Sequence, residues 1–592
     1  RVEVGLDALV YLDRLAVDDD LRRAVAVVVP ELEAPWLAAA PNGFVSGQVK
    51  VWRPLPDDPL YHDVRLDLEG VGLALPMAPW RATGLVGQVL VQGTGPSARI
   101  DFDALRGRLE HDSAAPAQLA LLGHIESGPM PRRDLAFVVR DLELCPQLGR
   151  TLDELGALEY ATWTSLLPSG RVDLVCRARA EDSRDDLQVV VQLVDVRSEA
   201  AMLPKPAEHM TGELRIEDGE LTFRDVRAEL GGALVRCWDG RVRQRGPDDG
   251  RTEISFSVHA TDFPVDDGLA NLFSGPLRRA VLERRLRGQA DVDGLRLTFA
   301  VPPTGNDLPF STTIQGQLGL DGVDMLLGTG RDGIRVDDLR GTVVLSESTV
   351  TEQGGGIDGT LRSGSLSLFG HPFEAIQASF SADAERLLLD SLISRVHDGL
   401  LQNARPDAPG LLYLLPSPNV PEGRLAGDLS FERVDVFSLL TTSGWQNPPY
   451  SGQASGRMTL RRLDGNDVVG AEAEGTLRIE RADLGRVPLF SAIYAQLPAA
   501  DQPRFHFLDL VYRLTGQRVV FETLDVRSDL LAAKGSGTLE LDGYLDVRMQ
   551  LDNLLGTSAD PLVMPLIDYL AKNLVRFHLF GYLRDLHAEQ RW

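Results

Sequence analysis

Apolar residues alternate with charged or polar ones along much of the chain, and glycines, often preceded by aspartate, interrupt the alternation. The segment Gly212–Leu230, GELRIEDGELTFRDVRAEL, shows this pattern around Asp218-Gly219, and Gly537–Leu551, GTLELDGYLDVRMQL, repeats it around Asp542-Gly543. A period of two residues indicates strands with one apolar face, and Asp-Gly is typical of a hairpin turn. Further turns of this kind are predicted at Asp239-Gly240, Asp293-Gly294, Asp321-Gly322, Asp332-Gly333 and Asp358-Gly359. The pattern therefore predicts a long antiparallel meander.

Short helices are predicted between groups of strands, at nearly regular intervals. They are Val17–Arg23, Leu152–Leu158 and Val265–Asn271, and each leads into a glycine near the start of a strand: Gly47, Gly170 and Gly288. The glycines are 170 − 47 = 123 and 288 − 170 = 118 residues apart, which indicates a repeat of about 120 residues. A weaker fourth copy is predicted from Leu387 through Gly423. We therefore divide the chain into three repeats, 1–140, 141–261 and 262–385, and a carboxy-terminal region, 386–592.

Charge and cysteine content exclude several classes of protein. The 592 residues include 60 Lys+Arg and 86 Asp+Glu, a formal net charge of −26, and 43% of them are hydrophobic. Such a chain is too apolar to be disordered and too acidic for a generic nucleic-acid binder. Cys145, Cys176 and Cys237 are isolated in the sequence, which excludes a disulfide framework and a cysteine zinc site. No apolar run approaches the roughly 18 to 20 residues that cross a bilayer.

The predicted apolar face must be covered by a second layer, a partner or a ligand. The predicted helices are too few to cover it, and aromatic residues, which fill sandwich cores, make up only 6% of the chain. We therefore predict a mostly β fold: an elongated groove of antiparallel strands, curled into a trough with an apolar inner face, with short helices between repeats. About 40 strands at roughly 4.8 Å spacing would make this trough on the order of 190 Å long. The residues predicted to line the inner face are Leu214, Ile216, Leu221, Phe223, Leu477, Ile479, Val519, Phe521, Leu539, Leu541, Leu545, Val547 and Met549.

Two parts of the chain resemble a known family. Gly452–Leu583, which contains GTLRIERADLGRVPLFSAIYAQL and PLIDYLAKNLVRFHLFGYL, resembles the carboxy-terminal region of AsmA-like proteins. Gly212–Gly240 is similar to the repeating unit that AsmA-like and TamB-like chains share. The resemblance implies a repeating β-groove and a bridge-like lipid transfer protein, which shields phospholipid acyl chains across the periplasm of a diderm bacterium and meets membranes or membrane proteins at its ends.

The resemblance also implies that the chain is not an enzyme, has no catalytic residues and uses no cofactor. It implies attachment to the inner membrane through an amino-terminal segment. The chain begins without such a membrane helix, so the expectation is a fragment of a longer bridge.

Other interpretations of the same residues remain open. Alternation alone is more often produced by a closed protein core. A TamB-like scaffold would offer a strand edge to outer-membrane proteins during their assembly. A glycan-active or adhesive β-solenoid would need aromatic platforms or paired carboxylates in a cleft. The arginine-rich Leu277–Arg287 would either contact anionic head groups or cap a repeat, and the amphipathic Pro561–Leu574 would either plug the carboxy-terminal mouth or pack against the sheet.

Motifs for catalysis and metal binding are weak. Gly328–Gly333 matches GxGxxG, but a strand pattern follows it instead of a helix, so we interpret it as a turn. Asp291 and Asp293 precede Gly294 as in a calcium loop, yet the bidentate glutamate of such a loop is missing. The sequence therefore predicts neither a catalytic nor a metal site.

Overall fold

The computed structural model covers residues 1–592. It describes the chain except for residues 1–4, 29–32, 56, 75–79, 95–96, 112–113, 128–131, 155–159, 182–183, 201–202, 218–219, 245–251, 274, 302–309, 329–332, 352–353, 406–409, 417–422, 449, 483–504, 529–531, 553–575, 584 and 591–592. The described part contains 31 strands of one antiparallel sheet and a few short helices. The predicted mostly β fold with short helices is therefore confirmed.

The chain divides into two compact units, which we describe separately. Unit 1 comprises Arg1–Thr261 and Leu297–Leu308, and unit 2 comprises Asp262–Arg296 and Pro309–Trp592. The elements up to β13 are β1 (Leu6–Ala16), α1 (Asp19–Val28), α2 (Glu33–Ala39), β2 (Asn42–Arg53), β3 (Tyr61–Ala74), β4 (Arg81–Thr94), β5 (Ser97–His111), β6 (Ala114–Glu126), β7 (Arg132–Glu143), α3 (Pro146–Glu154), α4 (Tyr160–Leu166), β8 (Pro168–Glu181), β9 (Arg184–Ser198), β10 (Ala207–Glu217), β11 (Glu220–Leu230), β12 (Ala233–Gln244) and β13 (Thr252–Val265).

The remaining elements, most of which belong to unit 2, begin with a short 3-10 helix. They are η2 (Asp267–Leu272), α5 (Gly275–Glu283), β14 (Arg287–Val301), β15 (Ser311–Leu327), β16 (Ile334–Thr351), β17 (Gly354–Gly355), β18 (Ile357–Leu368), β19 (His371–Ala382), β20 (Arg386–Val396), β21 (Gly399–Asn403), β22 (Leu411–Leu414), β23 (Arg424–Asp435), α6 (Val436–Thr442), β24 (Gln453–Asp464), η3 (Val468–Gly470), β25 (Glu472–Glu480), β26 (Phe505–Thr515), β27 (Arg518–Ser528), β28 (Ala532–Glu540), β29 (Tyr544–Asp552), β30 (Arg576–Tyr582) and β31 (Asp585–Gln590).

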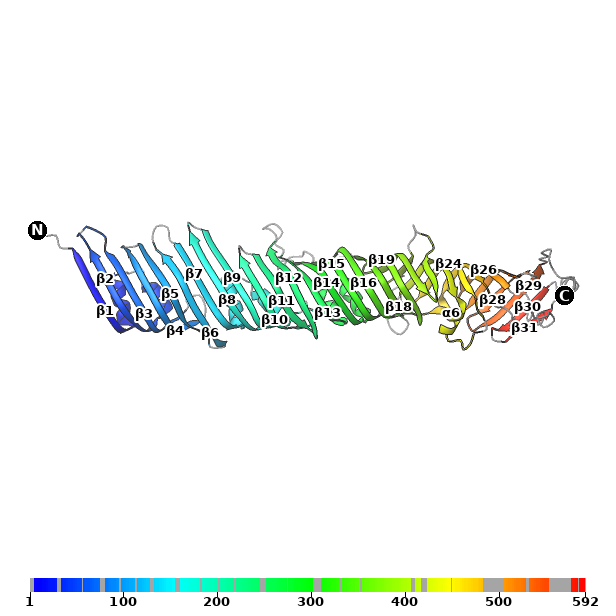
Figure 1. The fold of residues 1–592 in the computed structure, drawn as a ribbon, viewed down its shortest axis with the longest axis horizontal. Coiled ribbons are helices and arrows are strands. Elements are labelled where there is room, and N and C mark those ends of the chain that lie inside the picture. The colour runs from blue at the N-terminus through cyan, green and yellow to red at the C-terminus, as the bar shows by residue number, and fades with distance from the viewer. Residues whose placement is uncertain are drawn as a thin grey trace. The chain divides into compact units, whose positions relative to one another are not determined.

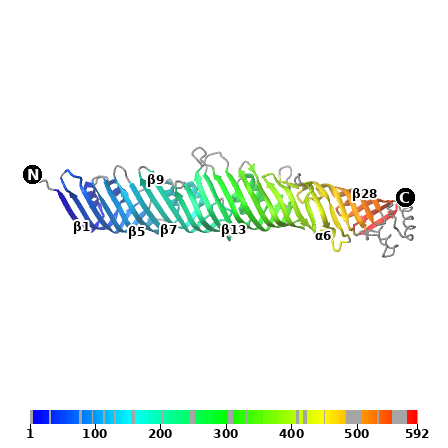
Figure 2. The ribbon, with the colours of Figure 1, turned by 45° about the horizontal axis from the view of Figure 1, so that its top comes forward.

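The strands form a meander, as the alternation predicted. In unit 1 each strand from β1 to β12 pairs antiparallel with the next one in sequence. Unit 2 continues in this way from β15 to β31, with β17 beside β16 and with β21 and β22 sharing the place between β20 and β23. Figures 1 and 2 show the strands side by side within each unit. The described strands all belong to this one sheet.

Most of the predicted Asp-Gly turns are not turns. The Asp542-Gly543 turn is confirmed by the hydrogen bond from Gly543 N to Glu540 O, at 2.9 Å. The pairs Asp239-Gly240, Asp293-Gly294, Asp321-Gly322 and Asp358-Gly359 lie inside strands β12, β14, β15 and β18, and Asp218-Gly219 and Asp332 lie outside the described residues. The strands are therefore longer than expected, with β16 reaching 18 residues.

A line of β-bulges crosses the strands of each unit, and it explains these errors. In most strands one residue has a positive φ, and the register with a neighbouring strand shifts there; an example in unit 1 is Ala104 (φ 45°) between the pairs of Phe102 and Leu105. The corresponding residues are Arg14, Gly70, Gly84, Asp141, His209, Asp225 and Asp239 before Thr261, and Asp262, Gly294, Gly322, Asp338, Ser363, Ala375 and Arg433 after it. We call this set the bulge line. A bulge bends its strand and increases the local twist, so the bulge line bends the sheet.

The bulged backbone is held by side chains of the neighbouring strand. The N–H of Asp262 donates to Asp291 Oδ1 at 3.0 Å, and the N–H of Asp338 donates to Asp324 Oδ1 at 2.9 Å. A serine takes this role at Arg433, whose N–H donates to Ser455 Oγ at 2.9 Å. A bulge removes the ladder partner of this N–H, and the side chain replaces it.

Two of the three predicted helices begin within two residues of the predicted start, whereas α3 begins at Pro146, six residues before the predicted Leu152. Asp18 Oδ1 accepts from the backbone N–H of Asp20 at 3.0 Å at the start of α1, and Asp266 Oδ1 accepts from Gly268 N at 2.8 Å at the start of η2. Aspartate in this position satisfies a free N–H group of the first turn. Six strands, β2 to β7, separate the first helical segment of unit 1 from the second. An even number of antiparallel strands returns the chain to the side of the sheet from which it started. Both helical segments therefore lie beside the same long edge of the sheet, meaning the edge that the ends of the strands form.

The predicted fourth copy of the repeat was wrong. Leu387 lies in strand β20, not in a helix, because a short apolar run fits either structure and here finds strand partners in β19 and β22. The fourth helical segment, after α1–α2, α3–α4 and η2–α5, is α6, and it leads into Gly452, which has a φ of 136°. Gly47, Gly170 and Gly288, which follow the earlier helices, also have positive φ values. A Cβ at Gly47 would overlap the carbonyl oxygen of Arg65 on the next strand, so this position requires glycine.

Fully buried apolar residues in unit 1 gather between the bulge line and the helices. Val71 and Leu85, each just beyond a bulge, pack in one cluster with Leu21 of α1 and Trp36 of α2. A second cluster contains Leu109, Val139, Leu142 and Val172 and contacts Leu148 of α3. Helices thus cover one strip of the apolar face, along one edge of the sheet.

Candidate functional site

Beyond the bulge line, the apolar face of unit 1 continues in rows across hydrogen-bonded strands. Residues directly opposite each other on antiparallel strands share a face, so the registers define each row. One row is Leu12, Gly47, Leu66, Val89, Phe102, Gly123, Leu135 and Ala178. Another is Leu121, Phe137, Cys176, Val189, Ile216, Leu221, Val242 and Ile254. We call this part of unit 1 the open strip.

The open strip is less buried than the strip under the helices. Leu66, Val89, Phe102, Leu121 and Leu135 are all half-buried, although each lies in the middle of a sheet. The two clusters of unit 1 in which helix side chains pack on the sheet contain none of these five residues. The open strip is therefore an apolar surface that neighbouring side chains shield only from the sides.

The opposite face of unit 1 is mainly polar and is crossed by ion pairs. Arg177 donates both to Asp134 Oδ1 and to Asp134 Oδ2 at 3.0 Å, and this bidentate hydrogen bonding lowers the pKa of Asp134. Leu122 lies on this face and is 47% exposed, whereas its neighbour Leu121 points to the open strip. Leu121 and Leu122 therefore place the same type of side chain on opposite faces of the sheet.

The structure brings the four predicted residues of unit 1 together. Leu214 is directly opposite Phe223, and Ile216 is directly opposite Leu221, on the half-buried apolar face. The Phe223 ring lies over Gly240, where a Cβ would overlap it, and its centroid is 6.2 Å from that of Phe256. Their association with lipid remains a prediction.

The predicted residues of unit 2 also share rows, but they differ in burial. Leu477 faces Leu510, Leu510 faces Leu524, and the same row reaches Gly535 and Met549. The half-buried members of the predicted set are Leu477, Ile479, Val519, Phe521 and Leu539. Leu545, Val547 and Met549 are buried, with Val547 only 1% exposed, in a cluster with Phe577 and Leu579 of β30. These three positions belong to a packed core in this structure.

Leu541 does not lie on the inner face. It follows the last residue of β28 and lies in the turn to β29, where it is 44% exposed. The strand ends one residue earlier than the alternation suggested, because the hydrogen bond from Gly543 N to Glu540 O closes the turn.

The arginine-rich segment Leu277–Arg287 forms α5 as far as Glu283. Arg284 follows the helix, and its guanidinium lies 5.9 Å from the ring centroid of Tyr413. Burial lowers the pKa of Arg284 and raises the pKa of Tyr413 to about 12. This arginine therefore packs into unit 2. The other amphipathic segment, Pro561–Leu574, lies outside the described residues.

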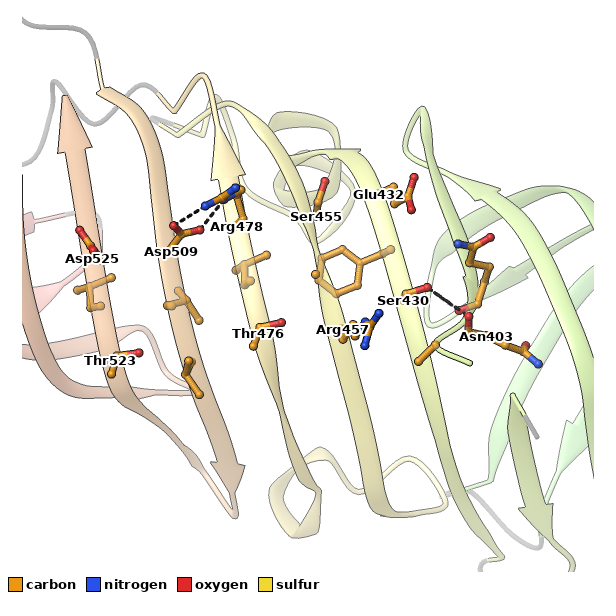
Figure 3. A pocket seen from close by; sticks show the side chains of 18 of the residues that line it. Asn403, Ser430, Glu432, Ser455, Arg457, Thr476, Arg478, Asp509, Thr523 and Asp525 are labelled. Atoms are coloured by element: carbon orange, nitrogen blue, oxygen red, sulfur yellow. Dashed lines mark hydrogen bonds and ion pairs between the residues drawn. The ribbon is translucent and has the colours of Figure 1, made fainter. Parts of the chain in front are cut away.

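A groove, which sequence reasoning missed, crosses the strands of unit 2, and its lining includes rows of polar side chains together with Leu477, Leu510 and Leu524 of the apolar row. It comprises a cavity of about 1130 Å³ and an adjoining one of about 300 Å³, and Arg457, Thr476 and Val511 line both. Figure 3 shows two rows of polar side chains in the larger cavity, one including Ser455, Arg478, Asp509 and Asp525, the other including Ser430, Arg457, Thr476 and Thr523. The rows are two residues apart on each strand, so they share a face. We call this region the polar groove.

Two of the carboxylates that line the polar groove, Asp509 and Asp525, are each held by an arginine. Asp509 and Asp525 are directly opposite each other on β26 and β27. Arg478 donates to both oxygens of Asp509, at 2.6 and 2.8 Å, and Arg527 donates to both oxygens of Asp525, at 3.0 and 2.6 Å. The hydrogen bonds from Arg527 lower the pKa of Asp525. Asp525 is thus held in its ionised form, which makes it a poor proton donor for catalysis.

Other candidate chemistry is sparse in the part of the chain that the structure describes. No group of three His, Cys, Asp or Glu side chains is placed to hold a metal ion there. Asp291, part of the calcium-like motif, instead accepts the backbone N–H of Asp262. The cysteines are unpaired, and burial raises the pKa of the Cys237 thiol to about 11, so this thiol is a poor nucleophile at neutral pH.

Comparison with models of known protein families, with curated proteins and with solved structures finds no match for this chain. The resemblance to AsmA-like and TamB-like proteins therefore rests on the quoted residues. Among the described helices, none has the length and apolar character required to span a bilayer.

Proposed function

We propose that the chain carries lipids between membranes, with acyl chains lying on the open strip. The observation that supports this most directly is the continuity of half-buried apolar rows across the hydrogen-bonded strands of unit 1. Monomeric proteins rarely expose contiguous apolar areas larger than a few hundred Å² unless something binds there. A phospholipid is a ligand that needs such a surface.

The energetic need for shielding is large. Two acyl chains with roughly 30 methylenes between them lose about 0.8 kcal/mol per methylene in water, or about 24 kcal/mol in total. A continuous apolar surface removes most of this cost at each step, so a lipid diffuses along it without full exposure to water. The proposed setting is the periplasm, with phospholipids as cargo and membranes or membrane proteins as partners at the ends.

The two edges of the open strip differ, and this suggests an orientation for the lipid. The helices cover the apolar face along one edge. At the other edge, cationic or titratable side chains occupy positions on the apolar face: Arg53 opposite Leu6, His62 opposite Val51 and Arg133 opposite Ile125. The head groups would lie at this second edge, with phosphates near the cationic side chains and acyl chains directed toward the helices.

Photo-crosslinking at adjacent residues tests this proposal. A benzophenone amino acid at Leu121 would face the lipid, whereas the same group at Leu122 would face solvent. After incubation with phosphatidylethanolamine vesicles, we expect lipid adducts by mass spectrometry at position 121 and few at position 122. Equal labelling at both positions, or none at either, would contradict the proposal. Adducts with an added unfolded barrel strand in place of lipid would favour the scaffold interpretation.

A further inference from the structure

Arg284 is a partly buried cation of unit 2 that lacks a counter-ion. It lies just after α5, and its backbone is fixed to the sheet because its carbonyl oxygen accepts the N–H of Leu326 of β15 at 2.8 Å. The Nη1 atom of its guanidinium is enclosed and has no hydrogen-bond partner. Glu283 lies near enough to favour its charge, but neither this carboxylate nor any other in the described part of the chain forms an ion pair with Arg284.

The surroundings of the Arg284 guanidinium are apolar. The group lies 5.9 Å from the ring centroid of Tyr413, which is 2% exposed and belongs to a cluster with the buried Ile334 and Leu415. A charge among apolar groups costs free energy unless it is paired, and a buried donor without a partner points to a bound water or ion. A water molecule would satisfy the N–H but would not balance the charge. An anion is therefore the ligand that fits this position.

The segment around Arg284 attracts anions. Residues 277–287 contain five arginines and one glutamate, although the whole chain has a net charge of −26. The other four arginines are exposed, and none of them forms an ion pair with a described carboxylate: Arg278, Arg279, Arg285 and Arg287. A local excess of positive charge raises the concentration of anions nearby. The long-range field of this segment therefore favours the same kind of ligand as the unpaired guanidinium.

An apolar row of unit 2 begins beside Tyr413. Leu411 lies two residues before Tyr413 on β22 and therefore shares its face. Residues directly opposite each other continue this row across β20 and across β23 to β28. Its half-buried apolar members include Leu389, Leu411, Leu460, Leu514, Val519 and Leu539, of which the last two were predicted to line the inner face. An anionic group at Arg284 and an apolar chain on this row would suit one amphiphilic molecule.

We propose that Arg284 binds the phosphate of a lipid whose acyl chains lie on this apolar row of unit 2. The planar guanidinium donates to the phosphate oxygens, and the phosphate supplies the counter-charge that the described residues do not. The inference rests on the proposed lipid function. It adds a fixed site for the head group in unit 2, apart from the cationic edge of unit 1.

Calorimetric titration of the full chain with the short-chain lipid dihexanoylphosphatidic acid tests the proposal. We expect this lipid to bind at least about tenfold more tightly than dihexanoylglycerol, which lacks the phosphate, and than inorganic phosphate, which lacks acyl chains. Arg284→Met should weaken its binding at least about tenfold, and Arg284→Lys should weaken it several-fold because lysine keeps the charge but not the planar donors. The control Arg279→Met removes an exposed arginine of α5 with the same change of charge and should change binding less than about twofold.

The melting temperature without lipid distinguishes a binding role of Arg284 from a structural one. Arg284→Met replaces an unpaired, partly buried charge with an apolar side chain, so the lipid-free variant should melt at no lower a temperature than the wild type. A clearly lower melting temperature would show that the arginine serves the fold and would overturn the inference. Unchanged lipid binding by a folded Arg284→Met variant, or binding of dihexanoylglycerol or inorganic phosphate as tight as that of the lipid, would also overturn it. Crosslinking at Leu121 is measured separately, so lipid adducts there together with any of these results would leave the proposed lipid function standing.

Discussion

A single charge on the open strip should block lipid binding, and the same charge one residue later should not. Leu121→Asp places a carboxylate on the apolar row between Leu105 and Phe137, whereas Leu122→Asp places it on the exposed polar face. The two variants have the same composition and net charge and differ in the face of β6 that is altered. A difference between them therefore reports on the face and not on the chemistry of the substitution.

The magnitude follows from the strand spacing. An acyl chain crossing one strand covers roughly 4.8 Å, or about four methylenes. Losing their burial, at about 0.8 kcal/mol each, costs about 3 kcal/mol. Since each 1.4 kcal/mol is tenfold in an equilibrium constant, occupancy at this point should fall roughly 100-fold. The carboxylate, which avoids an apolar surface, adds to this effect.

Native mass spectrometry after incubation with phosphatidylethanolamine and phosphatidylglycerol vesicles measures the occupancy. We expect bound lipid in the wild type and in Leu122→Asp, and little in Leu121→Asp. Leu121→Asn, which lacks the charge, should lie between them, and circular dichroism checks that all variants are folded. Wild-type occupancy in a folded Leu121→Asp variant would refute the assignment of the open strip as the lipid surface.

Two further predictions concern the fold of unit 2. His371 Nδ1 lies 2.9 Å from His397 Nε2, and His397 Nδ1 lies 3.0 Å from Ser438 Oγ of α6; burial lowers the pKa of both histidines, so the unfolded chain binds protons more readily than the folded one. The contribution of the two neutral histidines to the free energy of unfolding should be complete above about pH 6.5 and should be lost as the pH falls through their folded pKa values. In thermal melts from pH 8 to 5, His397→Gln should make the melting temperature depend less on pH. At the bulge line, Asp291→Ala removes the acceptor of the Asp262 N–H and should cost about 1 kcal/mol, seen as faster hydrogen exchange in β13. Asp291→Asn keeps an acceptor oxygen, and equal exchange in the two variants would show that this hydrogen bond is unimportant.

The alternation predicted the strands and their apolar face because it depends only on local geometry. Aspartates before apolar runs predicted the helix starts for the same reason, as Asp18 and Asp266 show. The sequence did not reveal that Leu545, Val547 and Met549 are enclosed, since alternation is the same on an open and on a closed apolar face. Only packing against residues distant in sequence, such as Phe577, distinguishes the two.

The bulges and the polar groove required information that single strands do not carry. Asp-Gly favours a positive φ, and both a hairpin turn and a bulge provide one, so Asp239-Gly240 fits either until its strand partners are known. A usable signal was present: apolar spacing changes from two residues to three at a bulge, as from Phe223 to Val226. The polar groove joins residues from Ser391 to Gly535, so no local pattern announces it.

The three-residue step at each bulge also helps to explain why part of the apolar face of unit 1 is open. Because a bulge inserts one residue, an uninterrupted alternation would place polar side chains on the apolar face beyond it. The sequence instead shifts its alternation at each bulge, as between Phe102 and Leu105, so apolar residues occupy the same face on both sides of the bend. On one side the helices bury these residues, and there packing explains their apolar character. On the other side of the bulge line, a surface that faced only water would be expected to carry polar side chains, as the opposite face of the sheet does. The proposed lipid ligand would account for an open strip that is nevertheless apolar from strand to strand.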